Sequence, residues 1–211
     1  MSGLLADKNA AVERVRALLN STQGCTLIGI VGKPGAGKST LSQYISESIN
    51  SPQLAVLPMD GFHLSNAVLA ELHRADRKGA PDTFDVAGFI ALLTRIRNEE
   101  DSHIYYPIFD RSIEESIAAQ GVISSETKVV IVEGNYLLHQ EDGWQNVAKI
   151  LHETWYIDID DELRIERLIA RHIAYGKSES AAEQWARGSD ERNAELIALG
   201  AERADYVIRL D

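Results

Sequence analysis

A glycine-rich loop between two apolar patterns constrains this 211-residue chain more than any other feature. Residues 27–31 form an apolar run rich in β-branched side chains, and residues 32–39 read Gly-Lys-Pro-Gly-Ala-Gly-Lys-Ser. The apolar residues that follow, Leu41, Ile45 and Ile49, recur at the spacing of a helix. This order of strand, glycine loop and helix is the context that the pattern G-x-x-x-x-G-K-[ST] requires. The sequence therefore predicts a phosphate-binding loop.

The residue types of this loop suit a nucleoside triphosphate. Glycines lack a Cβ, so the backbone can turn its N–H groups inward and form an anion nest at the positive end of the helix. Lys38 brings a charge to the β- and γ-phosphates, and the Ser39 hydroxyl is offered to Mg²⁺. A chance turn capped by Ser39 is the alternative, which the flanking strand and helix disfavour. We expect nucleotide contacts from Gly32, Lys33, Pro34, Gly35, Ala36, Gly37, Lys38, Ser39 and Thr40.

Composition and charge narrow the class of protein. The net charge of −11 argues against nucleic acid or an anionic membrane as the general partner. Cys25 is the only cysteine, which excludes an intrachain disulfide and fits a reducing compartment. No apolar run approaches the ~18 residues of a membrane span, and residues 1–9 lack the features of a signal peptide. We therefore expect a cytoplasmic enzyme without membrane insertion.

Strand-like and helix-like segments alternate along the chain, which predicts a mainly parallel sheet with helices on both faces. The expected fold is the three-layer α/β sandwich of P-loop NTPases, as a single domain over residues 1–211 with an N-terminal helical extension over residues 1–24. Strands are expected at 27–31, 54–57, 103–109, 128–132, 155–159 and 206–210, and helices at 4–19, after Ser39, and at 66–72, 86–96, 160–175 and 180–199.

Two acidic residues directly follow apolar strands, where open α/β sheets bind their ligands. Glu133 follows residues 128–132, where a P-loop protein places the acid that orients the Mg²⁺ shell. Asp60 follows residues 54–57 and is placed to orient an alcohol and accept its proton beside the γ-phosphate. A solvent-facing strand-end glutamate and an Asp-Gly turn are the respective structural alternatives.

Three arginines after residue 160 recur at i, i+3 and i+7, so they share one helix face. Guanidinium groups suit phosphate oxygens and the charge of a transition state. A solvated charged face, with Glu162 and Glu166 nearby, is the alternative. Beside a phosphate-binding loop we expect at least one of the three to contact phosphate. They are Arg164, Arg167 and Arg171.

Five motifs, in order, are similar to those of the uridine kinase, phosphoribulokinase and bacterial pantothenate kinase superfamily of P-loop kinases. From about Thr26 onward the chain most resembles small kinases described as fructose transport system kinases or nucleoside/nucleotide kinase-like proteins. The motifs are the loop at 32–39, Asp-Gly-Phe-His-Leu-Ser-Asn at 60–66, Arg-Lys-Gly-Ala-Pro-Asp-Thr-Phe-Asp at 77–85, Tyr-Pro-Ile-Phe-Asp-Arg at 106–111 and Val-Glu-Gly-Asn-Tyr at 132–136.

The resemblance implies an ATP-dependent kinase that uses Mg²⁺ and phosphorylates a small-molecule hydroxyl. The catalytic aspartate of the family maps onto Asp60, and its strand-end acid maps onto Glu133. The helix at 163–168 looks like the helix of a lid, which we place within residues 160–190. The catalytic residues are then Asp60, Lys38 and Arg167, the metal ligands Ser39 and Glu133, and the lid contacts to nucleotide Arg164, Arg167 and Arg171. The segments that face the acceptor supply Asp60, His63, Arg77, Tyr106, Arg111, Glu133 and Asn135.

The sequence leaves the identity of the acceptor open. The residues after Asp60 are Gly-Phe-His, which differ from the Ser-Phe-Tyr type of nucleoside kinases, and pantothenate kinases share Asp-Gly-Phe without the His. We expect a sugar or sugar-like alcohol, with a nucleoside or pantothenate as alternatives. A nucleotide-hydrolysing regulatory protein is an alternative of another class, although the chain has no Asn-Lys-x-Asp segment of a GTPase.

Overall fold

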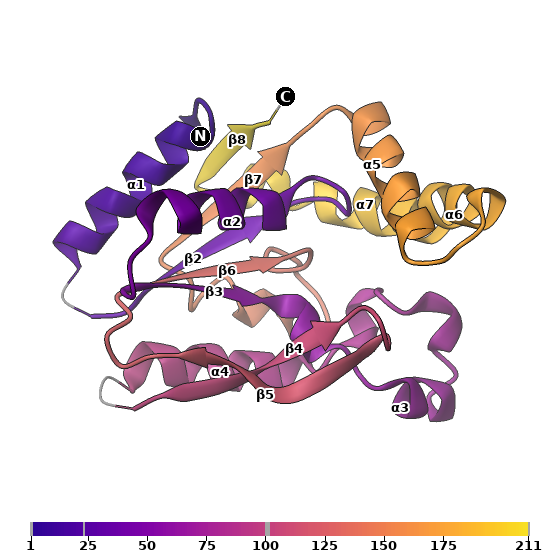
Figure 1. The fold of residues 1–211 in the computed structure, drawn as a ribbon, viewed down its shortest axis with the longest axis horizontal. Coiled ribbons are helices and arrows are strands. Elements are labelled where there is room, and N and C mark those ends of the chain that lie inside the picture. Colours follow the sequence, from indigo (N-terminus) through magenta and orange to yellow (C-terminus); the bar gives the residue numbers. More distant parts are fainter. Residues whose placement is uncertain (1, 23, 100–101, 211) are drawn as a thin grey trace.

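The computed structural model describes residues 2–22, 24–99 and 102–210, and its centre is a six-stranded sheet in the order β1-β8-β7-β2-β6-β3 (Figure 1). All neighbouring strands of this sheet are parallel. The mainly parallel sheet that the sequence predicts is therefore confirmed. The strands are β1 (Gly3–Leu5), β2 (Thr26–Val31), β3 (Leu54–Pro58), β6 (Val129–Gly134), β7 (Glu153–Asp158) and β8 (Tyr206–Arg209).

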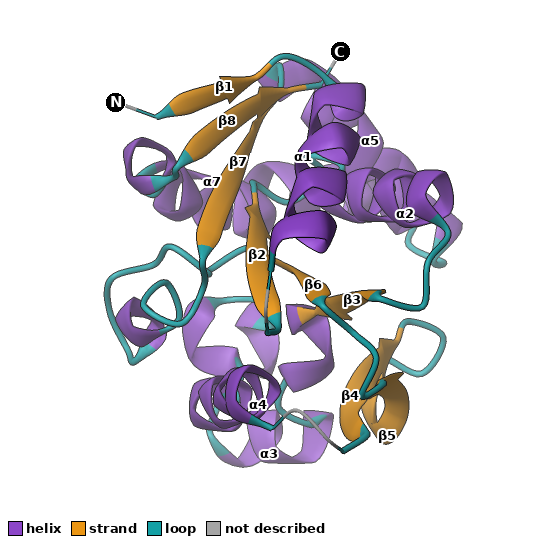
Figure 2. Cartoon of the chain, turned by 90° about the vertical axis from the view of Figure 1, so that its left-hand side faces the viewer, coloured by secondary structure: helices purple, strands orange, loops and turns teal. Residues whose placement is uncertain are grey.

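Helices cover both faces of the sheet and form two cores (Figure 2). On one face α1 (Lys8–Ser21) and α2 (Lys38–Ile49) pack on side chains such as Ile28 and Ile131. On the other face α4 (Val86–Asn98) and α7 (Glu191–Ala198) pack on side chains such as Leu27 and Val130. Because successive side chains of a strand point to opposite faces, the fully buried strands β2 and β6 supply both cores. The three-layer sandwich is thus confirmed.

A two-stranded hairpin lies apart from the main sheet and consists of β4 (Ile104–Asp110) and β5 (Glu115–Ile123). The strand expected at 103–109 is confirmed as β4. The sequence pattern did not predict β5, because its exposed central residues, 117–120, include two Ala and a Gln rather than an apolar alternation. The hairpin packs on the turn at residues 59–62, since a Cβ on Gly61 would lie 2.0 Å from the carbonyl oxygen of Pro107. This contact brings the end of β4 beside Asp60.

The N-terminal residues differ from the sequence prediction. Leu4 and Leu5 were expected in a helix, but they lie in β1 and pair with β8. Leu5 is buried and Leu4 is 64% exposed, the alternation of a strand. Helix α1 begins only after Asp7, whose carboxylate accepts the N–H groups of Asn9 and Ala10.

The carboxyl ends of β3 and β6 point toward the part of the molecule where α3, α5 and α6 lie (Figure 1). The helix expected over residues 160–175 is confirmed as α5 (Asp161–Ala174), capped by Asp160, and the short helix expected at 66–72 is α3 (Asn66–Glu71). The helical stretch expected at 180–199 is divided into α6 (Glu179–Trp185), a π-helical turn at Ala186–Asp190 and α7. Within the described ranges, no helix is both long and apolar enough to cross a membrane.

Candidate active site

The glycine loop joins β2 to α2 and is shaped by two left-handed residues. Gly35 has φ 82° and Gly37 has φ 90°, a conformation that side chains disfavour. Gly37 caps α2 without a side-chain hydrogen bond, which leaves the first turn of the helix open to an anion. A Cβ on Gly35 would lie 2.7 Å from the carbonyl oxygen of Arg164, so α5 packs directly on the loop. The side chain of Lys33 adds a second link, because its ammonium pairs with Asp161 of α5 at 2.8 Å.

Lys38 curls over this loop. Its Nζ donates to the carbonyl oxygens of Gly32 at 2.8 Å and Lys33 at 3.2 Å. Burial lowers the pKa of Lys38 to about 8, an effect that the carboxylates of Asp60 and Glu133 partly oppose. A cation that the protein has partly desolvated interacts strongly with an incoming anion.

Glu133 lies at the end of β6 with only 8% of its surface exposed. It accepts hydrogen bonds from the hydroxyls of Ser39 at 3.0 Å and Ser42 at 2.9 Å. Burial raises the pKa of Glu133, while the two serine hydrogen bonds and the charge of Lys38 lower it. The structure thus brings Lys38, Ser39 and Glu133 together as the sequence predicts. Ser42 was missed, although its place one helical turn after Ser39 indicates it.

Asp60 lies in the turn that follows β3. Pro58 pairs with Glu133 across the sheet, so Asp60 comes two residues beyond this pairing. Its Oδ2 accepts a hydrogen bond from Nη2 of Arg111 at 2.7 Å, and 34% of the Asp60 side chain remains exposed. β3 neighbours β6 rather than β2, so the strand next in sequence to the glycine loop is two places away in the sheet.

Cations outweigh burial in setting the charge of Asp60. Burial by itself would raise the pKa of the carboxyl, but four basic side chains hold the pKa below its ordinary value of 3.8. Asp60 is therefore ionised at neutral pH, which is the form that a general base requires. The four side chains are His63, Arg111, Lys38 and Arg171.

His63 lies beside Asp60 in an aromatic setting. Its Nδ1 is 2.7 Å from the carbonyl oxygen of Asp60. The ring stacks on Phe84 and Phe109, with centroid distances of 4.0 and 4.7 Å. Burial lowers the pKa of His63, although Asp60 partly opposes this effect. The structure thus places His63 and Arg111 beside Asp60, and the expectation that they face the acceptor stays a prediction.

The three arginines of α5 lie in different surroundings. Arg164 was expected to contact phosphate, but it is fully buried and donates to the carboxylates of Asp161 and Glu191 and to the carbonyl oxygen of Pro34. It therefore fastens α5 to α7 and to the glycine loop instead of facing a ligand.

The other two arginines are not consumed by buried ion pairs of this kind among the described residues. Nη1 of Arg167 is 3.8 Å from the position that a Cβ on Gly37 would take. Burial lowers the pKa of Arg171, and so does the charge of Arg111, while Asp190 and Asp60 raise it. Arg171 therefore lies within electrostatic reach of Asp60, and Arg167 lies at the rim of the loop.

Three expected acceptor residues show no contact with Asp60. Tyr106 is only 7% exposed and donates its hydroxyl to the carbonyl oxygen of Val56 at 2.9 Å, so it supports the core instead. Arg77 is ion-paired with Asp82 at 2.8 Å. Asn135 is half-buried after the end of β6. The sequence could not distinguish these three residues from those that contact Asp60. A motif places its residues near the site but does not fix where each side chain points.

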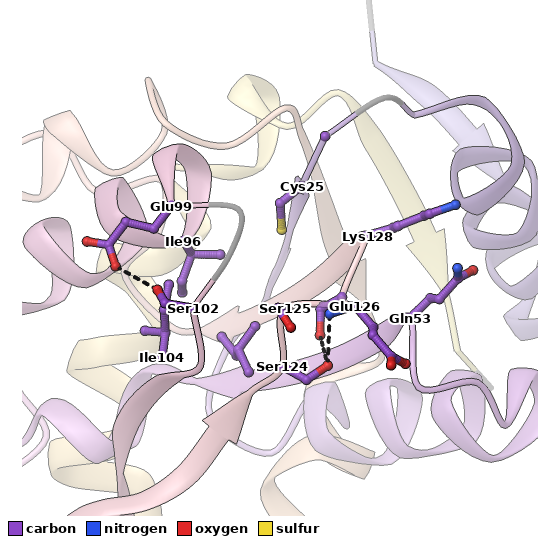
Figure 3. Close-up of a pocket in the computed structure, with 13 residues that line it drawn as sticks. Cys25, Gln53, Ile96, Glu99, Ser102, Ile104, Ser124, Ser125, Glu126 and Lys128 are labelled. Carbon is purple, nitrogen blue, oxygen red and sulfur yellow. Dashed lines mark hydrogen bonds between the residues drawn. The ribbon is translucent and has the colours of Figure 1, made fainter.

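A hollow of about 430 Å³ opens at the amino ends of the strands, away from Lys38, Asp60 and Glu133 (Figure 3). Its lining includes Cys25, Gln53 and Lys128, which precede β2, β3 and β6. Burial raises the pKa of the Cys25 thiol to about 11, so it is protonated at neutral pH and is a poor nucleophile. None of the expected site residues, all of which the structure describes, lines this hollow. Since parallel sheets bind ligands at the carboxyl ends of their strands, the cluster around Lys38, Asp60 and Glu133 is the candidate active site.

Comparison with known proteins gives matches over most of the chain. The model of the family described as "Phosphoribulokinase / Uridine kinase family" matches residues 27–210. The "Uncharacterized protein YggC" of Escherichia coli K12 is 31% identical over 189 residues, which cover 88% of this chain and 78% of that protein. A protein of Schizosaccharomyces pombe named "Putative uridine kinase C227.14" is 32% identical, over 80% of this chain and 73% of that one.

Two solved structures share the fold over almost all of both chains. The crystal structure of a "putative fructose transport system kinase" from Silicibacter sp. TM1040 has a TM-score of 0.85 and 34% sequence identity, over 95% of this chain and 98% of that one. YFH7 from Saccharomyces cerevisiae has a TM-score of 0.83 over 97% of this chain and 99% of that one. Its sequence identity is 20%, so this likeness concerns the fold alone.

Proposed function

The chain belongs to the phosphoribulokinase/uridine kinase family of P-loop kinases, and from that premise we propose that it transfers the γ-phosphate of ATP to the hydroxyl of a small alcohol, with Asp60 as the base. One observation carries this proposal. An ionised carboxylate, Asp60, lies beside the strand end that holds Glu133 and within electrostatic reach of Lys38. A base held that close to a phosphate-binding loop suits transfer to a second substrate.

The donor half of the site consists of the glycine loop, α2 and α5. Backbone N–H groups of residues 32–39 and the ammonium of Lys38 would hold the triphosphate. Arg167 and Arg171 are the arginines of α5 that remain to cover its γ-phosphate. Arg164 is not available for this role, because its guanidinium is paired with Asp161 and Glu191.

Ser39 and Glu133 fit a magnesium ion. Both offer hard oxygen atoms, and the partners of the Glu133 carboxylate are two hydroxyls, which leaves lone pairs for the ion or its waters. Within the described ranges, no three His, Cys, Asp or Glu side chains converge on a metal position, so phosphate oxygens and water would complete the shell. When bound, the ion would neutralise charge on the phosphates.

The transfer step uses Asp60 at the acceptor. The hydroxyl oxygen attacks the γ-phosphorus while its proton passes to the Asp60 carboxylate. The bond between the γ-phosphorus and the bridging oxygen of the β-phosphate breaks, and ADP and a phosphate monoester form. Arg171 lies near enough to Asp60 to meet the charge that develops on the transferred group.

We treat residues 160–190 as a lid within a single kinase domain. Helix α5 lies on the glycine loop, and Gly176, with φ 94° and open space around it, separates α5 from α6. A glycine in this conformation allows a hinge. Closure over the nucleotide would exclude water and so protect ATP from hydrolysis.

A sugar or sugar-like alcohol is the acceptor that we favour. The support is the name of the Silicibacter protein, which shares 34% identity with this chain. A nucleoside is the second candidate, because the Schizosaccharomyces pombe relative carries the name of a uridine kinase. Neither name identifies the hydroxyl that is phosphorylated.

The release of ADP in the presence of different acceptors tests this function. The protein is incubated with ATP and Mg²⁺, with and without a panel of sugars, sugar acids, sugar phosphates, nucleosides and pantothenate. A kinase releases ADP only when a suitable acceptor is present. Release that does not depend on the acceptor would favour a hydrolase and contradict the proposal.

A further inference from the structure

The acceptor side of Asp60 concentrates positive charge in a chain whose net charge is −11. Arg111, at the end of β4, is paired with Asp60 at 2.7 Å, and Arg171 of α5 acts on the same carboxylate through its charge. The two guanidinium groups are close enough for each charge to disfavour the other, since the charge of Arg111 lowers the pKa of Arg171. Both charges act on Asp60, the proposed base.

The ring of Phe109, two residues before Arg111, contacts three basic side chains. The ammonium of Lys78 lies 5.2 Å from the centre of the Phe109 ring, and the Arg111 guanidinium carbon lies 5.7 Å from it. The ring of His63 stacks on the same side chain. These contacts hold Arg111 and Lys78 at one wall of the acceptor region.

The nearby carboxylates already have other partners. Asp110 accepts from the backbone N–H and hydroxyl of Ser112, at 2.8 and 2.6 Å. Asp190 is 2.7 Å from Nε2 of His172. Glu115 accepts the N–H of Asn66 at 2.9 Å and, with Glu114, offsets part of the charge of Lys78. The carboxylate that meets Arg111 is therefore Asp60 itself.

This arrangement creates a conflict for a neutral acceptor. Asp60 has to accept a proton, but one of its oxygens is bound to Arg111 and its basicity is lowered by that charge. Separating a half-buried ion pair without a replacement partner leaves an uncompensated charge. An acceptor with an anion of its own would bind Arg111 in place of Asp60 and free the carboxylate for the hydroxyl proton.

We infer that the acceptor is an anionic alcohol, either a hydroxy acid or a phosphorylated sugar, whose carboxylate or phosphate takes the place of Asp60 on Arg111. The inference rests on the proposed role of Asp60 as the base. A guanidinium binds either anion through paired hydrogen bonds. A hollow of about 460 Å³ adjoins Arg111, and its polar lining includes Ser112, Gln120, Tyr175 at the end of α5 and the carboxylate of Asp110, which is bound to Ser112. Its volume suits a small metabolite.

Two other roles for Arg111 lead to different kinetics. If Arg111 only positions Asp60, its loss lowers kcat for charged and neutral acceptors alike. If Arg111 binds the γ-phosphate, its loss raises the KM for ATP. If Arg111 binds the anion of the acceptor, its loss raises the KM for charged acceptors and leaves the KM for ATP unchanged.

The first experiment compares matched acceptors with the full chain, ATP and Mg²⁺. The two sets are glycerol, D-glycerate and glycerol 3-phosphate, and fructose, gluconate and fructose 6-phosphate. We expect kcat/KM to be at least about 100-fold higher for a charged member than for its neutral partner, and Arg111→Gln to reduce that ratio by about 10- to 100-fold, as the loss of a charge-assisted hydrogen bond predicts. Arg95→Gln, which removes an exposed pair with Glu99 on α4, is the matched control and should keep the ratio. The better of the two charged members identifies the anion as carboxylate or phosphate.

If the neutral acceptors are turned over as well as the charged ones or better, the inference is overturned, but the proposed kinase activity stands. The same holds if Arg111→Gln lowers kcat/KM equally for charged and neutral acceptors. Absence of transfer to every acceptor would count against the proposed function.

In that case a binding experiment still decides the inference, with ADP and Mg²⁺ filling the donor site. Inorganic phosphate should bind at least about 10-fold more tightly to Asp60→Asn than to the wild type, because the competing carboxylate is gone. The double variant Asp60→Asn/Arg111→Gln should lose this gain in phosphate affinity. If Asp60→Asn binds phosphate no more tightly than the wild type, the inference is overturned.

Discussion

At the scale of single residues, Gly61 is the point where the turn that carries Asp60 meets the hairpin. A Cβ at Gly61 would lie 2.0 Å from the Pro107 carbonyl oxygen, so no side chain fits unless backbone moves. We expect Gly61→Ala to lower the free energy of unfolding by about 1–3 kcal/mol, measured by urea denaturation. Gly188→Ala is the control, because its added Cβ meets nothing within 4 Å. Equal stabilities of the two variants would show that the contact is not needed.

Glu133 gives a prediction about magnesium. Its carboxylate holds the Ser39 hydroxyl from a buried position, and the proposal makes both residues part of the metal shell. In Glu133→Gln the Mg²⁺ concentration for half-maximal activity should rise by about 10- to 100-fold, the usual cost of losing such a group. Glu47→Gln, which changes an exposed carboxylate on α2, should have no effect. A Glu133→Gln variant with unchanged magnesium dependence would remove Glu133 from the metal site.

The lowered pKa of Lys38 gives a prediction about pH. The free protein holds the Lys38 proton with a pKa of about 8, and phosphate oxygens beside the ammonium raise that pKa when nucleotide binds. The bound state therefore carries more protons above pH 8, so the affinity for ATP should fall as pH rises through 8, by up to about tenfold per unit. Calorimetric titrations from pH 7 to 9.5 measure this fall. Lys38→Met should bind more weakly with a flatter profile, and a wild-type affinity that is constant to pH 9.5 would contradict the assignment.

At the scale of elements, helix α5 places arginines of one predicted face in two different surroundings. Arg164 is a buried structural residue, and Arg171 lies within electrostatic reach of Asp60. We expect Arg164→Gln to lower the free energy of unfolding by about 1–3 kcal/mol, since it removes the buried hydrogen bonds that tie α5 to Glu191 and to the glycine loop. Arg171→Gln should instead lower kcat by about 10²- to 10³-fold with little change in unfolding.

Denaturation and steady-state kinetics of both variants separate these effects. Arg187→Gln serves as the control, because Arg187 is 60% exposed and pairs only with the equally exposed Glu183 among the described residues. Reversed outcomes, with a stable Arg164→Gln and an unfolded Arg171→Gln, would contradict the division of roles along α5.

The elements also show what the sequence could and could not predict. The glycine loop, Glu133 and Asp60 were predictable because each follows an apolar strand directly, and the order of a parallel sheet brings such ends together. Strands β1 and β5 could not be predicted in this way. The three residues of β1 also fit the apolar spacing of the helix that follows them, and the middle of β5 is exposed on a hairpin outside the main core.

The side chains that differ from prediction depend on partners far away in the chain. Arg164 is neutralised by Glu191, which lies 27 residues later. Tyr106 reaches Val56, 50 residues earlier. Spacing along one helix or strand identifies a face, but these long-range contacts decide whether that face meets a ligand or the core.

At the scale of the whole molecule, the donor and acceptor halves of the site come from opposite sides of β6. The glycine loop and α2 follow β2 on one side, and the turn with Asp60 follows β3 on the other. The hairpin β4–β5 adds Arg111, and α5 adds Arg171. Lys38 and Asp60 interact across this junction. The proposed transfer therefore moves the γ-phosphate from the loop toward the acceptor beside Asp60.

Phosphoryl transfer by Asp60→Asn tests this account most directly. With the acceptor that gives the fastest ADP release, ³¹P NMR follows the appearance of the phosphorylated product, and calorimetry measures ATP binding. The account predicts ATP affinity within about twofold of the wild type and transfer slowed by about 10²- to 10⁴-fold, the usual contribution of a general base. Asp76→Asn, a change in an exposed loop, should transfer at the normal rate. Near-normal transfer by Asp60→Asn would contradict the central role of Asp60.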